Sequence, residues 1–443
     1  MIASVLMFAG TIVASNYVVM AQLLGESFLR HHPDSRFVIL VIDDGPVPES
    51  ATDLEIWRLS DIDLPDSDLD LMKTVYDVME FSTAVKPSLL RSLLRHDDVV
   101  CYLDPDIFVY APFSDVVESV RESGIVLTPH VLHPVPRDGY AVSERMIMQS
   151  GMFNLGFIGV GRSASAFLDW WNERMLVDAV VDLDAGLFTD QRWVDWVPAL
   201  FPYQTCRDPG MNIAWWNIHE RELDLAEGRP RVGGSAVRFV HFSGYDPGDP
   251  DVLSKHQHPF PRTPHEPGRV IRTLAERYGQ ELIARGHLDR RAEPYRWARS
   301  DDGTLLTPGI RKLCRRHAVA ELEAGAQSGE LMSAVAFGER SSGFRKWLES
   351  PGGGTISAPH SIFERTVWSG RPDLRSAFPD VDEADAAAFR TWLDTEEFAR
   401  QSLGEFWHAR PVPATPTDAP RGLVARARTA SRRMAQRVVR SFR

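Results

Sequence analysis

Two aspartates separated by one residue, Asp104 and Asp106, are the side chains in this sequence best placed to do chemistry. They follow the apolar run 99–103, which is typical of a buried strand, so both carboxylates stand where that strand ends. Carboxylate oxygens suit Mg²⁺ and Mn²⁺, and such a cation can neutralise the charge that builds on a leaving nucleotide diphosphate. An Asp-x-Asp pair alone is also common in solvated turns, so its position after a strand is what favours a metal site.

The elements that must position this pair alternate between strand and helix. Strand-like runs lie at 3–9, 37–43 and 98–103, and helical patterns lie between them at 16–32 and 82–96. Further strands are expected at 124–129 and 153–161. This alternation predicts an α/β fold with a mostly parallel sheet covered by helices on both faces. Because such sheets bind ligands beyond the carboxyl ends of their strands, Asp104 and Asp106 fall at the expected place.

The first 25 residues carry no charge, which leaves the N-terminus open to more than one interpretation. A signal peptide normally begins with a positive region, and this chain has none. A transmembrane helix is allowed by length, but the polar residues 15–17 and Gln22 interrupt the apolar run. We therefore expect a buried strand at 3–9 followed by a helix.

The rest of the chain differs in composition from its first 250 residues. Residues 251–300 are rich in Pro, His and Arg and are expected to connect two parts, whereas residues 301–410 show mostly helical patterns. Residues 411–420 form a Pro-rich linker, and residues 421–443 contain eight arginines and no acidic residue. This tail is predicted to form a basic amphipathic helix that docks on an anionic membrane, with a disordered basic tail as the alternative.

Composition excludes some functions. A net charge of −12 argues against general nucleic-acid binding. Three cysteines, odd in number and far apart, predict neither a disulfide framework nor a zinc site. They favour a reducing cytoplasm, with the basic tail on the inner face of the membrane.

Four motifs in one order carry a resemblance to a known family. They are Asp104-x-Asp106, Phe153-Asn154-Leu155-Gly156, Asp190-Gln191 and His241-Phe242-Ser243-Gly244. Over residues 1–250 this order resembles the GT-A nucleotide-diphospho-sugar transferases, in particular the retaining glycosyltransferase family eight and its uncharacterised, actinobacterial-like bacterial relatives. The resemblance implies a GT-A Rossmann-like catalytic domain at 1–250, followed by a mostly helical C-terminal module.

The resemblance also implies residue roles. Asp104, Asp106 and His241 would hold Mn²⁺ or Mg²⁺, and Asp104 would also reach the donor ribose. Asn154 and Gln191 would hydrogen-bond the donor sugar, with Asp190 on its reactive face. The remaining donor-binding positions implied by the family are Ala9, Gly10, Asn16, Tyr17, Lys86, Gly156 and Gly244.

Several alternatives stay open beside these roles. His241 and Tyr17 can be ordinary buried side chains, Lys86 a solvated lysine, and Thr189 or Asp190 a helix cap. The lysine that the family places after the His-Phe-x-Gly motif is absent here, and Lys255 or His256 is the candidate replacement. Trp215 and Trp216 are candidates for stacking on a sugar, with a core and rim pair as the alternative.

Taken together, these features predict a metal-dependent, retaining glycosyltransferase. The donor would be a nucleotide-diphosphate sugar, most simply a UDP-sugar, and the acceptor a glycan or a lipid-linked sugar. A sugar nucleotidyltransferase is an alternative, although the expected Gly-rich phosphate loop is missing after the first strand. A catalytically silent scaffold that binds sugar or membrane is the other alternative.

Overall fold

The computed structural model describes residues 7–49, 53–256, 262, 265–331, 335–339, 341–350, 360–369 and 371–395. These residues fall into two compact units. The first comprises the described residues of Met1–Pro65 and Val78–Trp297, and the second those of Asp66–Asp77 and from Ala298 onward. The linker 411–420, the basic tail 421–443 and residues 396–410 of the expected helical module lie outside the described residues.

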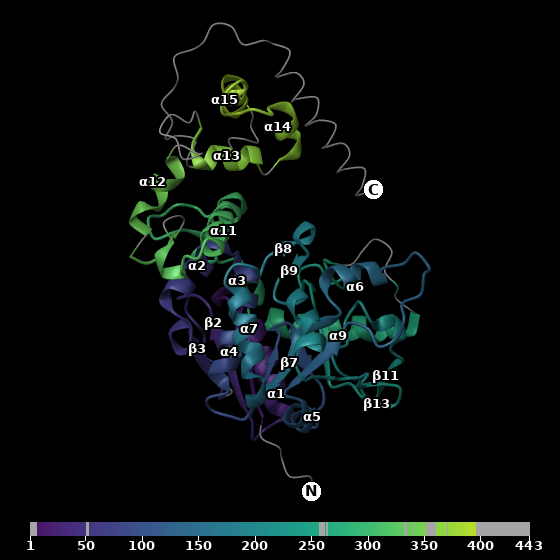
Figure 1. The fold of residues 1–443 in the computed structure, drawn as a ribbon. Coiled ribbons are helices and arrows are strands. Elements are labelled where there is room, and N and C mark those ends of the chain that lie inside the picture. Colours follow the sequence, from purple (N-terminus) through teal and green to yellow (C-terminus); the bar gives the residue numbers. More distant parts are fainter. Residues whose placement is uncertain are drawn as a thin grey trace. The chain divides into compact units, whose positions relative to one another are not determined.

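A seven-stranded sheet forms the centre of the first unit (Figure 1). β1 pairs in parallel with β2 and β4, whereas β7 runs antiparallel to both of its neighbours, β4 and β6. The expected α/β fold with a mixed, mostly parallel sheet is therefore confirmed. In spatial order the strands are β10 (Gln204–Thr205), β6 (Ile125–Pro129), β7 (Phe153–Gly161), β4 (Val99–Leu103), β1 (Phe8–Val13), β2 (Arg36–Val41) and β3 (Glu55–Arg58).

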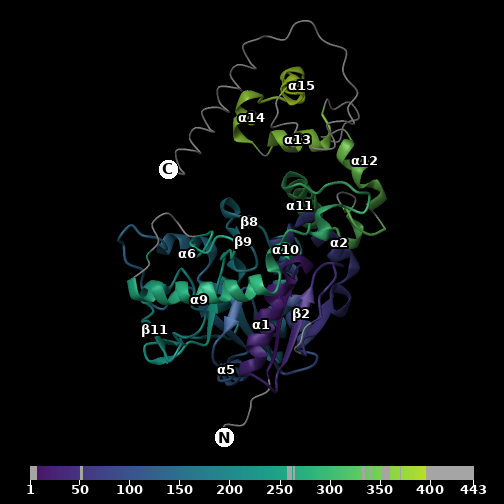
Figure 2. The ribbon, with the colours of Figure 1, turned by 180° about the vertical axis from the view of Figure 1, so that it is seen from behind.

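Helices cover both faces of this sheet, as the two opposite views show (Figures 1 and 2). α4 (Lys86–Leu93) and α7 (Ser165–Met175) lie on one face, and α1 (Val18–His31) and α5 (Val116–Ser123) lie on the other. Strand residues alternate between the two layers because successive side chains point to opposite faces. Ala9 packs in the core cluster that includes Leu24 and Phe28 of α1, while a Cβ on Gly10 would stand 3.1 Å from Leu93 of α4.

Smaller elements of the first unit flank the sheet. Two short sheets, β14–β5 and β11–β12–β13, and the hairpin β8–β9 complete its strands. Their bounds are β5 (Ile107–Val109), β8 (Val181–Asp182), β9 (Leu187–Phe188), β11 (Leu223–Ala226), β12 (Arg229–Val232), β13 (Ser235–Ala236) and β14 (Phe239–His241). The short helices are α3 (Val78–Ala84), α6 (Glu144–Ser150), α8 (Val197–Leu200) and α10 (His287–Arg291).

Two expectations from the sequence require correction. The first strand was expected at 3–9, but β1 runs from Phe8 to Val13, so its carboxyl end lies further along the chain. The segment 251–300 was expected to be a connection, yet it contains the twenty-residue helix α9 (His265–Ala284). Its apolar residues recur at helical spacing and are buried: Val270, Ile271, Leu274, Ala275, Tyr278 and Leu282. The Pro and His content of the whole segment masked this shorter periodic pattern.

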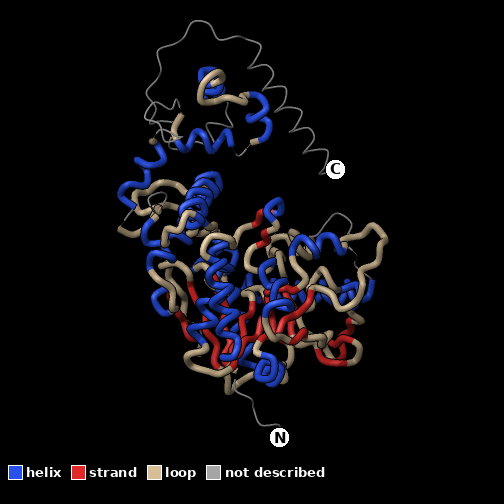
Figure 3. Tube along the Cα trace, viewed as in Figure 1, coloured by secondary structure: helices blue, strands red, loops and turns tan. Residues whose placement is uncertain are grey.

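The named elements of the second unit are helical, as expected (Figure 3). Within this unit the Arg311 side chain donates hydrogen bonds to the backbone oxygens of Lys73 and Tyr76, at 2.6 and 2.5 Å. α2 therefore belongs with helices more than 230 residues further along the chain. The helices are α2 (Asp66–Val75), α11 (Pro308–Glu323), α12 (Phe344–Glu349), α13 (Ile362–Ser369), α14 (Pro372–Ala377) and α15 (Ala386–Thr395).

Among the described residues, none of the helices combines the length and the apolar character needed to cross a lipid bilayer.

Candidate functional site

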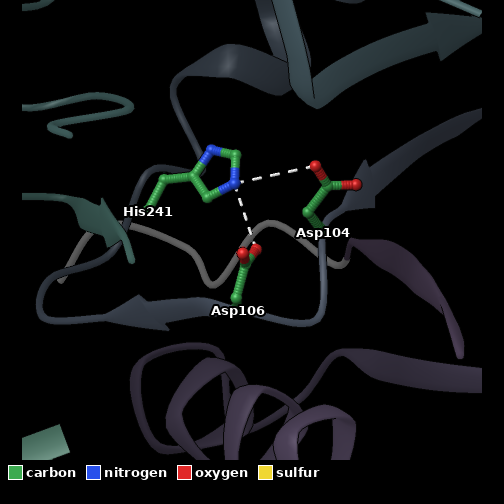
Figure 4. A group of neighbouring side chains, drawn as sticks. All are labelled: Asp104, Asp106 and His241. Carbon is green, nitrogen blue, oxygen red and sulfur yellow. Dashed lines mark ion pairs between the residues drawn. The ribbon is translucent and has the colours of Figure 1, made fainter. Parts of the chain in front are cut away.

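Asp104, Asp106 and His241 meet at the carboxyl end of β4 (Figure 4). The ring nitrogen Nε2 of His241 lies 3.0 Å from Asp106 Oδ1 and 3.7 Å from Asp104 Oδ2. Each residue offers one ligand atom, and these atoms all lie within 4.8 Å of one another. Two carboxylate oxygens and one imidazole nitrogen form a donor set that suits Mn²⁺ or Mg²⁺.

Strand pairing explains why a histidine far along the sequence reaches the two aspartates. β5 begins directly after Asp106 and pairs antiparallel with β14, which places His241 opposite Ile107. The backbone nitrogen of Phe242 then donates to the oxygen of Asp106, at 2.9 Å. The pairing of these two short strands therefore brings the Asp-x-Asp and His-Phe-x-Gly motifs together.

The charges of the three groups shift one another's pKa values. Burial raises the pKa of Asp104, although the nearby Lys86 and His241 act against that shift. Burial acts in the same direction on Asp106, but the imidazole of His241 outweighs it and the pKa of Asp106 is lowered. For His241, burial is outweighed by the carboxylate of Asp106, so its pKa is raised. In the part of the chain that the structure describes, the buried Asp106 Oδ1 meets no donor other than the His241 ring. An oxygen of this kind fits a site built for a cation.

Gly156 makes room for His241. A Cβ at position 156 would stand 2.4 Å from His241 Cε1 and 2.8 Å from Asn154 Oδ1. The ring cannot easily move away, because His241 is buried and packs against Trp216 at 5.3 Å between centroids. The last position of the Phe-Asn-x-Gly motif is therefore a packing requirement of the histidine.

We expect Gly156→Ala to displace the histidine ring. Overpacking of this kind costs about 1–3 kcal/mol, so urea unfolding should show a loss in that range. Titration calorimetry should show Mn²⁺ binding weakened by about tenfold or more, as for other changes that disturb a ligand. Gly309→Ala is the control, since only the Thr307 hydroxyl, at 3.9 Å, lies near the Cβ it would add. Unchanged Mn²⁺ affinity in Gly156→Ala would show that the His241 ring does not need a glycine at position 156.

Asn154 and Gln191 are joined to each other. Asn154 Nδ2 donates to Gln191 Oε1 at 3.2 Å, and Gln191 Nε2 donates to the backbone oxygen of Ser150 at 2.8 Å. Asn154 Oδ1 accepts from the backbone nitrogen of Gly156 at 3.1 Å. The two amides predicted to bind the donor sugar are thus fixed by hydrogen bonds to each other and to the backbone. Both also line the pocket described below.

Lys86 and Asp190 form a buried ion pair. Lys86 Nζ lies 2.6 Å from Asp190 Oδ2 and 3.8 Å from Asp104 Oδ1, and it donates to the backbone oxygen of Leu155 at 3.1 Å. Lys86 is 1% exposed and Asp190 is 2% exposed, so the alternative of a solvated lysine is wrong. The helix-cap alternative is also wrong, because the short 3-10 helix Arg192–Trp196 begins after Gln191 and has no side-chain cap.

These groups line one pocket of about 600 Å³. Asp104, His241, Asn154, Asp190 and Gln191 supply its polar wall. The hairpin β8–β9 and helix α6 supply apolar side chains, including Met146, Ile147, Val181, Leu183 and Phe188. A pocket that combines convergent polar groups with apolar walls has the character of a small-molecule site.

The four donor-binding positions expected near the first strand do not line this pocket. Ala9 and Gly10 are inside the sheet because β1 continues to Val13, so a role in direct donor contact is corrected to one in packing. Asn16 and Tyr17 do follow the carboxyl end of β1. Asn16 Nδ2 donates to the backbone oxygen of Glu293 at 3.0 Å, and Tyr17 is 40% exposed with its ring edge-on to His287.

The segment after the His-Phe-x-Gly motif returns to the pocket. Gly244 adopts a φ of +73°, and a Cβ there would stand 2.5 Å from His256. The backbone nitrogen of Lys255 donates to the oxygen of Gly244 at 2.8 Å. Lys255 and His256 both line the pocket, where they are available to an anionic group. The turn at Gly244 therefore brings Lys255 and His256 to the site, and burial lowers the pKa of His256 so that its ring is neutral near pH 7.

Both tryptophans line the pocket, and Trp216 is buried. Its ring stands edge-on between His241 and His130, with centroids 5.3 and 5.4 Å away. Burial lowers the pKa of His130 to about 4, so its ring is neutral near pH 7. Trp215 is less buried and contacts Trp216. This arrangement matches the core and rim alternative.

Some residues of the site were not expected from the sequence. They are His130, Thr189 and Asn212, and the last two adopt positive φ values of 49° and 53°. Thr189 is β-branched, so this conformation is a genuine outlier, and it directly precedes Asp190. Its hydroxyl donates to Asp190 Oδ1 at 3.1 Å. Asn212 had one sequence signal, because it follows Pro209-Gly210, a pair typical of turns.

Comparison with known proteins gives several similarities. No family model matches the chain. Over an alignment of 248 residues, which covers 53% of this chain and 80% of the relative, the chain is 27% identical to the uncharacterized protein YfnF of Bacillus subtilis (strain 168). It is similar to the solved structure of the galactosyltransferase LgtC in complex with donor and acceptor sugar analogs, with a TM-score of 0.37, 16% identity, and coverage of 63% of this chain and 100% of that one. It is also similar to the glycosyltransferase GlyE of Streptococcus pneumoniae TIGR4, with a TM-score of 0.33, 12% identity, and coverage of 63% and 64%.

Proposed function

We propose that this chain is a metal-dependent glycosyltransferase that uses a nucleotide-diphosphate sugar, a UDP-sugar in the simplest case. The observation that carries the proposal is the meeting of Asp104, Asp106 and His241 at the edge of a pocket whose wall also holds Asp190 and Gln191. A divalent cation bound by the three ligands would neutralise charge on the leaving diphosphate. The order of the four motifs, which resembles that of glycosyltransferase family eight, supports the same assignment.

Each polar residue of the pocket has its own proposed role in binding the donor or in the reaction. Lys255 and His256 stand at the pocket where a diphosphate would extend from the metal ligands. Asp190 lies further along the wall, and its carboxylate would stabilise positive charge that develops at the sugar carbon. Asn154 would hold Gln191 in place, so that Gln191 presents a fixed surface to the sugar. Retention of configuration remains a prediction that rests on the family resemblance.

The acceptor side is assigned to the apolar part of the pocket. Val181 and Leu183 of the hairpin β8–β9 line it together with Trp215, which lies in the segment before the 3-10 helix Ile218–Glu220. A glycan or a lipid-linked sugar would enter here and meet the donor near Asp190. Docking of residues 421–443 on an anionic membrane remains a prediction, because the tail lies outside the described residues.

Nucleotide release tests the proposed function. The purified protein should release nucleotide from at least one of a panel of UDP-, GDP- and dTDP-sugars in the presence of Mn²⁺. EDTA should abolish this release and added Mn²⁺ should restore it, because the cation neutralises the leaving group.

Asp106→Ala provides the matched test of the site. The side chain stands in a loop after β4 and is only partly buried, so the variant should keep its fold while losing metal-dependent release. Full activity in EDTA, or full activity of Asp106→Ala, would contradict the proposed role of the metal.

A further inference from the structure

The Nδ1 nitrogen of His241 lies between two amide oxygens. Asn154 Oδ1 is 3.2 Å away and Asn212 Oδ1 is 3.3 Å away. The orientation of each amide is set by its other bonds. Asn212 Nδ2 donates to Thr128 Oγ1 at 3.0 Å and to Asn154 Oδ1 at 2.9 Å, so its oxygen is the atom left for the histidine. Because amide oxygens only accept, Nδ1 must carry a proton.

We propose that Asn212 is a positioning residue of the metal site, which fixes the tautomer and ring orientation of His241. With the proton held on Nδ1, the Nε2 nitrogen faces Asp104 and Asp106 and can act as a ligand. The inference rests on the proposed function, because it assumes that Asp104, Asp106 and His241 bind a divalent cation. It adds a residue outside the four motifs to the machinery of that site.

Asn154 alone does not complete this arrangement. Its Oδ1 already accepts from the backbone nitrogen of Gly156 and from Asn212 Nδ2, at 3.1 and 2.9 Å. An amide oxygen has two lone pairs, so a third donor from His241 has to share them. Asn212 Oδ1 is the second acceptor that the ring needs. Both asparagines are therefore needed to hold the Nδ1 nitrogen of His241.

Asn212 is itself held firmly. It is 1% exposed and adopts a φ of +53°, a left-handed conformation that asparagine tolerates better than most residues. The side chain of the buried Asn217 donates to the backbone oxygen of Asn212 at 3.0 Å. The backbone nitrogen of His241 donates to the oxygen of Ile213, the next residue, at 2.8 Å. Strained backbone held by its surroundings in this way is characteristic of functional sites.

The test replaces Asn212 with glycine. Glycine accepts a φ of +53° without strain, so Asn212→Gly removes the amide while keeping the backbone conformation. Titration calorimetry with Mn²⁺ alone is expected to show binding weakened by about 10–100-fold, the range typical of lost partners behind a ligand. Glu227→Gly is the matched control, because Glu227 has the same φ of 53° in an exposed turn. Its Mn²⁺ affinity should equal that of the unaltered protein.

A second readout needs no metal. In protein labelled with ¹⁵N at histidine and kept at alkaline pH, where the His241 ring is neutral despite its raised pKa, the unaltered chain should report a proton on Nδ1. Asn212→Gly should shift the ring towards a mixture of tautomers. The signal is assigned by its loss in His241→Asn. If Asn212→Gly does not fold, Thr128→Val removes the acceptor that orients Asn212 and should give the same shift.

The outcomes separate this inference from the proposed function. An unaltered tautomer together with unaltered Mn²⁺ affinity in Asn212→Gly overturns the positioning role and leaves the proposed function standing. Failure of the unaltered protein to bind Mn²⁺ overturns the metal-dependent function. In that case the ¹⁵N measurement still decides whether Asn212 holds the ring, because it is made without the cation.

Discussion

Asp190→Asn is expected to lower kcat by about 100-fold or more, the size of effect seen when a charge placed for the transition state is removed. The change keeps the volume of the side chain but removes its charge, and it leaves one acceptor oxygen where the carboxylate offers two to Lys86 and Thr189. If the carboxylate acts on positive charge that develops at the sugar carbon, KM for the donor should change little. Steady-state measurement of nucleotide release over a range of donor concentrations separates the two parameters.

Asp184→Asn is the control for this change. Asp184 is exposed in the turn between β8 and β9, so kcat should not change. Circular dichroism and a thermal melt should show that Asp190→Asn stays folded, since Lys86 keeps Asp104 as a neighbour at 3.8 Å. An unchanged kcat in Asp190→Asn would assign the carboxylate to the ion pair with Lys86 alone.

The sequence predicted that Asp104, Asp106 and His241 lie together, and the structure brings them together. The apolar run 99–103 predicted a strand, and Asp104 and Asp106 stand at its carboxyl end in the structure. The position of His241 came only from the order of motifs. No periodicity indicates that β14 pairs with β5, because strand pairing between residues 130 to 134 apart is decided by tertiary packing.

The residues that the sequence missed are those whose role depends on long-range contacts or on unusual backbone. Asn212 has a positive φ and contacts His241; its residue type and the preceding Pro209-Gly210 favour a turn there but do not indicate the contact with a histidine 29 residues further on. Lys86 was expected to bind the donor or to be solvated. Its burial follows from the position of α4 on β1 and β4, and Asp190 reaches it across 104 residues of sequence. Helix α9 was missed for a simpler reason, since the composition of a fifty-residue window hid twenty helical residues.

Lys86→Met is expected to lower the free energy of unfolding by about 3–5 kcal/mol, the cost of breaking a buried ion pair by removing one partner. The pair is 2.6 Å apart, and its side chains are 1% and 3% exposed. Methionine keeps the length and apolar stem of lysine, so the loss comes from the charge and from the donor to the Leu155 oxygen. Urea unfolding followed by tryptophan fluorescence gives the value, provided that the m-value is unchanged.

An exposed pair of the same length supplies the control for Lys86→Met. Arg36 and Glu55 also lie 2.6 Å apart, but their side chains are 48% and 32% exposed. Arg36→Met should therefore cost no more than about 1 kcal/mol, because water solvates the remaining charge. The double variant Lys86→Met with Asp190→Asn should recover part of the stability lost in Lys86→Met, since it no longer leaves an uncompensated carboxylate in the wall of the pocket. If Lys86→Met costs as little as Arg36→Met, or if the double variant recovers nothing, the charge on Asp190 is not held by Lys86. Its role in the reaction would then have to be explained without that ion pair.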